Sequence, residues 1–252
     1  MNMVFDMNNE NLNLEKCDEL AQKGLVVLPG IFSEDITRKV KSQIFENKSL
    51  LKNTRSTENS LHLAGFHRYP EFENLHSLIS CNKTVLGFLK KVVNGGVLRN
   101  IGITDITINR SQCWHKDLLR GSYKSFLDAS TIWQAPGEVF RVLLYLQDSS
   151  SLKIVPGSHL KPISLESDDH AIPIEESNAE SVHVRAGDIV VMDVRTTHRG
   201  ASESECNSVK KNLGVLVATT LGSEGSLLAD QLEIGNSYRL KDWMKRNKGS
   251  TV

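Results

Sequence analysis

Apolar residues recur with a helical period in the first third of the chain, separated by short breaks. Residues 14–22 alternate apolar and charged groups at helical spacing and stop before Gly24, which suits a helix C-cap. Ser33 precedes two acidic residues, an N-cap pattern that predicts a helix ending near Phe45. A further helix is predicted over Val85–Val93, before a glycine-rich break.

After Val97 the pattern changes to short runs rich in β-branched residues, with glycine and proline between them. These runs predict strands, and one more short strand is predicted between the first two helices. A last periodic stretch, Leu227–Arg246, predicts a helical tail. The predicted strands cover Leu25–Leu28, Val97–Ile108, Val139–Gln147, Leu152–Val155, Val182–Val184, Ile189–Val194 and Leu213–Thr220.

This order of elements predicts a mainly β protein with flanking helices, an α+β arrangement. The 252 residues contain no internal repeat, linker or low-complexity tract, so we expect one domain over residues 1–252. Within it we expect N-terminal helices over about 1–96, a β core over about 97–220 and a C-terminal helical tail over about 225–248.

The composition argues against several classes of partner. Lys plus Arg and Asp plus Glu number 30 each, so no net field attracts nucleic acid or an anionic membrane. The first ten residues lack the basic and apolar regions of a signal peptide, and no apolar run is long enough to span a bilayer. The four cysteines are widely spaced, which favours free thiols. We therefore expect a cytoplasmic protein, whose oligomeric state the sequence leaves open.

Candidate metal ligands lie at two places far apart in the sequence. His115 and Asp117 are separated by one residue, and in a strand such residues point to the same side. His198 follows another strand-like run, so both groups lie at predicted strand ends. An isolated His-x-Asp is common and usually has no function, and it is this context that favours a site. Two imidazoles and one carboxylate on one face of a metal suit Fe(II) that must also bind a cosubstrate and dioxygen.

Four motifs follow one another along the chain: His115-Lys116-Asp117, FRVLLYLQD at 140–148, VPGSH at 155–159 and DVRTTHRG at 193–200. In this order they resemble the phytanoyl-CoA dioxygenase (PhyH) family of iron- and 2-oxoglutarate-dependent oxygenases, over about Gly24 to Thr220. The resemblance implies a double-stranded β-helix, a cupin-like jelly roll, with Fe(II) held at its open end by His115, Asp117 and His198. It also implies 2-oxoglutarate and O2 as cosubstrates, and succinate and CO2 as coproducts.

The sequence departs from that family at the residue for the cosubstrate. In the family an arginine after the second histidine usually binds the distal carboxylate of 2-oxoglutarate, because a guanidinium matches a carboxylate bidentately. Residues 201–213 contain no arginine; Lys210 stands at the expected place, with Lys211 beside it. Only one of them can point inward, and both could be solvated while another group fills the role. Other candidates for cosubstrate binding, each with an equally good interpretation as a loop or surface residue, are Asn109, Gln112 and Lys116.

A segment that mixes aromatic and hydrogen-bonding side chains follows the His-x-Asp motif. Such a loop beside a metal is a natural lid, and its aromatic residues either contact substrate or anchor the loop to the barrel. Arg141 shares a strand face with Tyr145 and is expected to reach into the barrel, where a buried arginine needs a partner. The candidate substrate contacts are Tyr123, Phe126, Trp133 and Arg141.

Together these features predict an oxygenase that hydroxylates an unactivated C–H bond of a small-molecule metabolite, in a biosynthetic pathway. The same chemistry diverted to desaturation or cyclisation is one alternative. A catalytically inactive jelly-roll binding module would explain the missing arginine. Zn(II) on the same three ligands would support hydrolysis instead.

Overall fold

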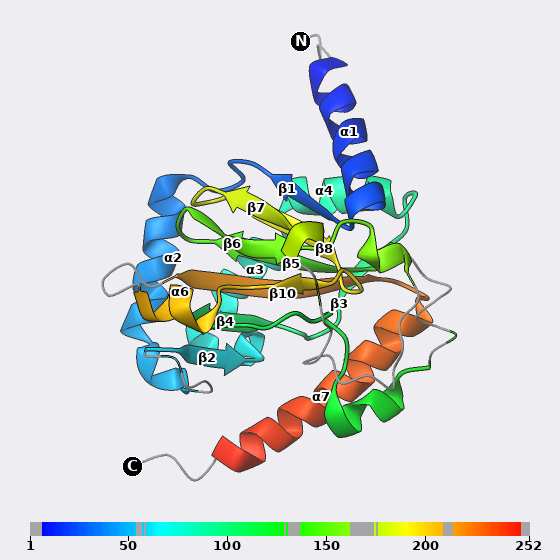
Figure 1. Ribbon diagram of the computed structural model, residues 1–252. Helices are drawn as coiled ribbons and strands as arrows, with labels where there is room; N and C mark the ends of the chain where they lie inside the picture. Colours follow the sequence, from blue (N-terminus) through cyan, green and yellow to red (C-terminus); the bar gives the residue numbers. More distant parts are fainter. Residues whose placement is uncertain are drawn as a thin grey trace.

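The computed structural model describes residues 7–53, 57, 59–128, 130, 137–161, 174, 176–208 and 214–247. Most helices come from the N-terminal third of the sequence or from its last part, and most strands come from the sequence between them (Figure 1). The helices are α1 (Met7–Lys23), α2 (Glu34–Glu46), α3 (Glu73–Ser80), α4 (Lys83–Val92), α6 (Glu203–Ser208) and α7 (Leu227–Asn247). The strands are β1 (Leu25–Leu28), β2 (Leu61–Ala64), β3 (Leu98–Asn100), β4 (Asp105–Ile108), β5 (Val139–Tyr145), β6 (Ser149–Ile154), β7 (Glu180–Val184), β8 (Ile189–Asp193), β9 (His198–Arg199) and β10 (Val215–Ser223).

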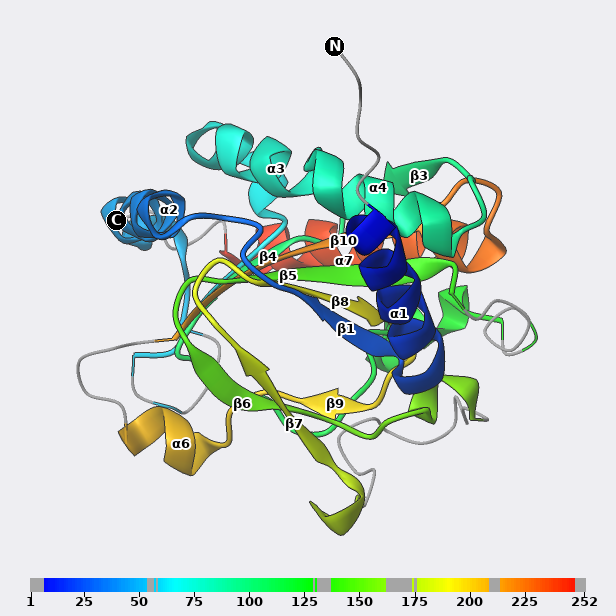
Figure 2. The ribbon, with the colours of Figure 1, turned by 90° about the horizontal axis from the view of Figure 1, so that it is seen from above.

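Two antiparallel sheets form the core. The larger has seven strands in the order β1-β8-β5-β10-β4-β2, with β3 also paired to β10, and the smaller has the order β7-β6-β9. Figure 2 shows the sheets facing each other, with α2, α3 and α4 covering the outer face of the larger one. This arrangement confirms the predicted jelly roll with flanking helices.

Alternation along the strands explains how both faces of the large sheet are used. On β5, Phe140, Val142 and Leu144 belong to the main core under the helices. The intervening Arg141 and Tyr145 face the space between the sheets, where they line a cavity. One face of β5 therefore packs into the core, and the other face provides polar side chains to the cavity.

The predicted helices and most predicted strands are present, with Ser33 accepting a hydrogen bond from the Ile36 amide as the N-cap of α2. The predicted strand over Val97–Ile108 was wrong as one element, because Gly102 at φ +73° turns the chain between β3 and β4. In the N-terminal region the predicted β1 joins the large sheet at one edge, and β2, which was not predicted, joins it at the other. Strand β2 has only four residues, too few to show a clear alternation.

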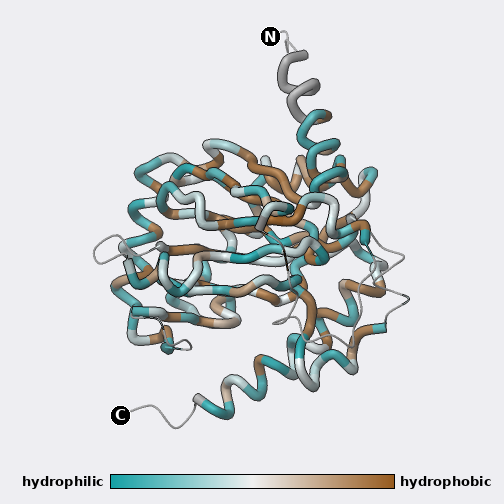
Figure 3. The backbone as a smooth tube through the Cα atoms, viewed as in Figure 1, coloured by the Kyte–Doolittle hydropathy of each residue, from teal (hydrophilic) through white to brown (hydrophobic). Residues whose placement is uncertain are grey.

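Helix α7 runs beside the 3₁₀ helix η4 (Gly121–Phe126) below the sheets (Figure 1). Hydrophobic and hydrophilic residues alternate along α7 (Figure 3), and its buried Leu228 and Leu232 pack with Leu118 and Leu119 of the loop before η4. None of the helices in the described part of the chain combines the length and apolar character that a membrane span requires.

Candidate metal centre and its cavity

Backbone hydrogen bonds bring the two predicted ligand segments together. His115 and His198 form an isolated antiparallel bridge, with the amide of each donating to the carbonyl of the other at 2.8 and 2.9 Å. The Asp117 amide donates to the Val194 carbonyl at 2.8 Å. The ligands therefore do not lie at the ends of β4 and β8 as expected: His198 begins the short strand β9, and His115 bridges to it from the loop after β4, which ends where Asn109 adopts φ +45°.

Each imidazole is held by the carbonyl two residues before it. His115 Nδ1 lies 2.7 Å from the Cys113 carbonyl, and His198 Nδ1 lies 2.9 Å from the Thr196 carbonyl. A carbonyl only accepts, so in both rings Nδ1 carries the proton and Nε2 keeps its lone pair. This tautomer and orientation are those of metal-binding histidines.

The two Nε2 atoms and the Asp117 carboxylate converge on one point. Asp117 Oδ1 lies 3.6 Å from His115 Nε2, and Oδ2 lies 3.7 Å from His198 Nε2. One ligand atom from each residue falls within 4.8 Å of the others. Bond lengths near 2.1 Å imply about 3 Å between neighbouring ligand atoms, so the donor set fits a divalent transition metal after a small closure.

The surroundings set the protonation states that a metal needs. Burial alone would raise the pKa of Asp117, but the charge of Arg141 and the two imidazoles outweigh it and hold this pKa well below its usual value. Burial and the neighbouring His115 lower the pKa of His198 to about 3. Burial also lowers the pKa of His115, against the opposing effect of Asp117. At neutral pH the carboxylate is therefore ionised and both imidazoles are neutral.

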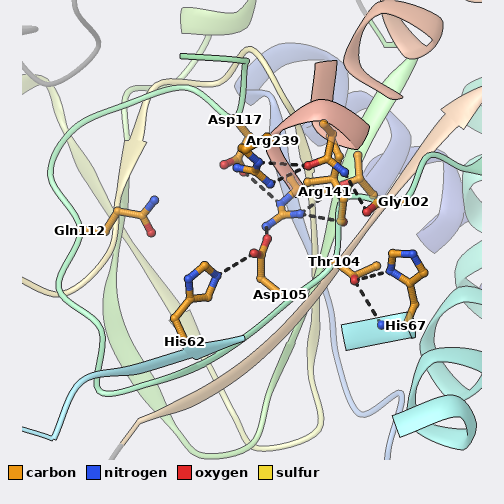
Figure 4. A network of polar contacts seen from close by, with 12 residues as sticks. His62, His67, Gly102, Thr104, Asp105, Gln112, Asp117, Arg141 and Arg239 are labelled. Carbon is orange, nitrogen blue, oxygen red and sulfur yellow. Dashed lines mark hydrogen bonds and ion pairs between the residues drawn. The ribbon is translucent and has the colours of Figure 1, made fainter. Parts of the chain in front are cut away.

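Arg141 links the metal triad to a second buried carboxylate (Figure 4). Its Nε lies 3.3 Å from Asp117 Oδ2, and its Nη2 lies 2.7 Å from Asp105 Oδ2. The other oxygen of Asp105 lies 2.8 Å from His62 Nε2. Four ionisable groups thus form one continuous chain from the candidate metal ligand to β2.

A cavity of about 580 Å³ opens beside the triad. Asp117 and His198 are part of its wall, and it extends between the sheets to Tyr145 and Leu216. Towards α7 the wall includes Leu232 and Arg239. The volume is typical of a site for a small molecule.

The predicted cosubstrate residues have different positions. Asn109 and Gln112 line the cavity, and the Gln112 amide lies 2.6 Å from His115 Nε2. The expectation for Lys116 needs correction, because its ammonium is buried against the carbonyls of Ser158 and Arg195, and the residue is not part of the cavity wall. Lys210 and Lys211 lie outside the described residues.

The predicted substrate contacts also separate. Tyr123 lines the cavity, and its hydroxyl donates to Asp242 at 2.7 Å. Phe126 is not in the cavity wall and stacks on Tyr238 of α7 with ring centroids 5.0 Å apart, so it anchors the segment. Arg141 does line the cavity, but its guanidinium donates a hydrogen bond to Asp105, in agreement with the expectation that a buried arginine needs a partner. Trp133 lies outside the described residues.

Sequence reasoning missed two parts of the cavity wall. One is the polar face of β4, where Asp105 and Thr107 alternate with the buried Ile106 and Ile108, a two-residue period that was readable in advance. The other is α7, whose Leu232, Asn236 and Arg239 line the cavity at helical spacing. No signal marked His62, on the four-residue strand β2, as a partner of Asp105.

Residues 20–206 match the phytanoyl-CoA dioxygenase (PhyH) family, whose members are iron- and 2-oxoglutarate-dependent oxygenases. The match covers most of the chain, and the protein therefore belongs to this family. A search of curated protein sequences returns no significant match.

Solved structures show the same fold at low sequence identity. The α-ketoglutarate-dependent epimerase SnoN of nogalamycin biosynthesis is 14% identical with a TM-score of 0.64, and 85% of this chain and 84% of SnoN are covered. The carbocyclase SnoK of the same biosynthesis is 20% identical with a TM-score of 0.61, covering 85% of each chain. HygX from Streptomyces hygroscopicus, crystallised with nickel, 2-oxoglutarate and hygromycin B, is 18% identical with a TM-score of 0.59, covering 84% of this chain and 87% of HygX.

Proposed function

We propose that this protein is an Fe(II)- and 2-oxoglutarate-dependent oxygenase that hydroxylates an unactivated C–H bond of a small-molecule metabolite. The observation that carries the proposal is the His115–Asp117–His198 cluster, whose ligand atoms converge beside a cavity of about 580 Å³. Family membership and the fold shared with SnoN and HygX support the same chemistry.

The protein's part in this chemistry is to hold and orient. Iron bound at the triad supplies oxidation by dioxygen, driven by decarboxylation of 2-oxoglutarate to succinate and CO2. His115 and His198 keep their Nε2 lone pairs available because backbone carbonyls fix their Nδ1 protons. The Gln112 amide donates to His115 Nε2 from the cavity wall, and a metal bound at that Nε2 would leave this amide free to hydrogen-bond a molecule in the cavity.

The distal carboxylate of 2-oxoglutarate still needs a cation, and we assign this role to Lys210. A lysine neutralises a carboxylate as a point charge, without the two parallel hydrogen bonds of an arginine. Replacing Lys210 with Ala should raise the apparent KM for 2-oxoglutarate, because losing a hydrogen bond between charged groups costs about 1.5–3 kcal/mol. Lys211→Ala is the matched control, and equal, small effects of the two changes would move the carboxylate contact to another residue.

Hydrolysis by zinc finds less support in the cavity. A hydrolytic site needs a general base with a pKa near neutrality. Burial alone would raise the pKa of Asp105, but the His62 hydrogen bond and the Arg141 charge hold it well below its usual value. This carboxylate is therefore a poor general base for hydrolysis.

The decisive experiment measures succinate formed from 2-oxoglutarate under air, with Fe(II) or with Zn(II). We expect slow succinate formation with iron only, and its loss in Asp117→Ala while the circular dichroism spectrum stays unchanged. Full activity of Asp117→Ala would show that the metal assignment is wrong, and no succinate from the iron-loaded wild-type protein would favour a binding module. Once a substrate is found, mass spectrometry distinguishes hydroxylation, which adds an oxygen atom, from desaturation or cyclisation, which remove hydrogen.

A further inference from the structure

We propose that Asp105, a buried carboxylate outside the metal triad, sets the metal affinity of the site by holding the Arg141 guanidinium away from full pairing with Asp117. The inference rests on the proposed metal site. It assigns a positioning role to Asp105, which does not contact the metal ligands. In the described part of the chain, its carboxylate oxygens contact only Arg141 and His62.

The contacts of Arg141 are divided unequally between the two carboxylates. Nη2 donates to Asp105 at 2.7 Å, and Nη1 donates to the Ile103 carbonyl at 3.0 Å and to Thr220 Oγ1 at 2.9 Å. Only Nε approaches Asp117, at 3.3 Å, and this buried N–H forms no hydrogen bond with it. The guanidinium thus lies beside Asp117 but directs its better hydrogen bonds elsewhere.

The large sheet holds this arrangement in place. Asp105 of β4 pairs in register with Ala218 of β10, and Arg141 of β5 pairs with Thr220 of the same strand. Both Asp105 oxygens are occupied, one by Arg141 and the other by His62 of the adjacent strand β2. Asp105, Arg141 and His62 are each less than a tenth exposed, so their contacts with one another are only weakly screened by solvent.

Without the charge of Asp105, two effects act in the same direction. The site loses one nearby negative charge, which reduces its attraction for a divalent cation. The guanidinium also loses its main partner and can turn fully towards Asp117, where it competes with the metal for the carboxylate. Removing Arg141 in addition eliminates the competitor and one positive charge, so the second substitution should undo much of the damage of the first.

The test is a titration of the full-length protein with Co(II), without 2-oxoglutarate, followed by isothermal calorimetry and by the visible absorption of the bound ion. We expect Asp105→Asn to weaken Co(II) binding about 10–100-fold, the usual effect of losing a partner behind the ligands. The double variant Asp105→Asn with Arg141→Met should bind Co(II) more tightly than Asp105→Asn alone. A purely structural role predicts the opposite, because the double change removes more of the buried network.

Asp188→Asn is the matched control, since Asp188 is a buried carboxylate that accepts from the Gly30 and Arg185 amides at the start of β8. It should leave Co(II) affinity unchanged. Unaltered binding by Asp105→Asn, or a double variant that binds no better than Asp105→Asn, would overturn the proposal.

A milder variant decides the question if Asp105→Asn does not fold. Thr220→Val removes one oxygen that holds Nη1 without changing any charge, and we expect about threefold weaker Co(II) binding; an unchanged affinity would then refute the positioning role. Failure of the wild-type protein to bind Co(II) would instead count against the proposed function, so the two failures are distinguishable.

Discussion

Replacing Gly24 with Ala should destabilise the protein and disturb the candidate metal centre at the same time. Gly24 ends α1 at φ +83°, with its amide bonded to the Leu20 carbonyl at 2.8 Å. Its own carbonyl accepts from the Asp193 amide at 2.9 Å and from Thr196 Oγ1 at 2.8 Å. The Thr196 carbonyl in turn fixes the His198 ring, so one residue connects the end of α1 to a predicted metal ligand.

The size of the effect follows from two separate costs. A left-handed conformation costs a residue with a side chain about 1–2 kcal/mol. A Cβ on Gly24 would also lie 2.4 Å from Thr196 Oγ1 and 2.5 Å from His159 Nδ1, and such overpacking costs about 1–3 kcal/mol. Together they give about 2–5 kcal/mol, a large part of a typical total stability of about 5–15 kcal/mol.

Gly30 provides a matched control for the backbone cost. It has φ +62° and open space where a Cβ would be placed, so Gly30→Ala should cost only about 1–2 kcal/mol. Urea unfolding curves of the two variants and the wild type measure the difference, and Co(II) titration measures the effect at His198. Equal destabilisation by the two substitutions, or an unchanged Co(II) affinity in Gly24→Ala, would refute the proposed connection.

Three further predictions concern the lid segment, pH and metal. Phe126→Ala should lower the free energy of unfolding by about 1–3 kcal/mol, through loss of the Tyr238 stack, and leave the KM for 2-oxoglutarate unchanged; a changed KM would restore Phe126 as an active-site contact. Burial, with the nearby positive groups, lowers the pKa of half-buried His67 to about 4, whereas in the unfolded chain this pKa is near 6.5. Between these pH values the unfolded chain therefore binds more protons than the folded protein. The contribution of His67 to stability is fully present above pH 6.5 and is lost as the pH falls towards 4. After allowance for solvent screening the loss by pH 5 is about 1 kcal/mol, and His67→Gln should remove this part of the pH dependence of urea unfolding. Co(II) at about 100 times its Kd should stabilise the wild type by about 2.7 kcal/mol and leave the Tm of Asp117→Asn unmoved; an equal rise in both would place the ion elsewhere.

The sequence predicted those elements whose signal is local. Ser33 and the glycines after helices mark helix ends because capping depends on a few neighbouring residues. Strand β5 was readable because its seven residues, although they include Arg141, are otherwise apolar or aromatic. Strands β2 and β3 have four and three residues, and the pairing that makes them strands is contributed by β4 and β10, far away in the sequence.

The same distinction applies to the site. His115, Asp117 and His198 carry a recognisable order along the chain, so they could be selected before any geometry was known. The partners of Arg141 could not, because Asp105 is brought to it by the register of β4, β10 and β5. Lys116 was misplaced for the complementary reason: a lysine between two metal ligands looks available, whereas two carbonyls on other segments hold its ammonium away from the cavity.

Different contacts hold the metal-ligand segments and helix α7 in place around the cavity. This difference explains why the sequence is more informative about the candidate metal ligands than about the substrate. The metal-binding segments are joined by backbone hydrogen bonds, such as those between His115 and His198, which do not depend on neighbouring side chains. Helix α7 is attached instead through side chains, including the Asn236 amide on the Gly102 carbonyl at 2.9 Å and the stack of Phe126 on Tyr238. Positions on α7 that face the cavity can therefore change without moving the triad. The fold itself therefore requires no fixed pattern of residues at the positions of α7 that line the cavity.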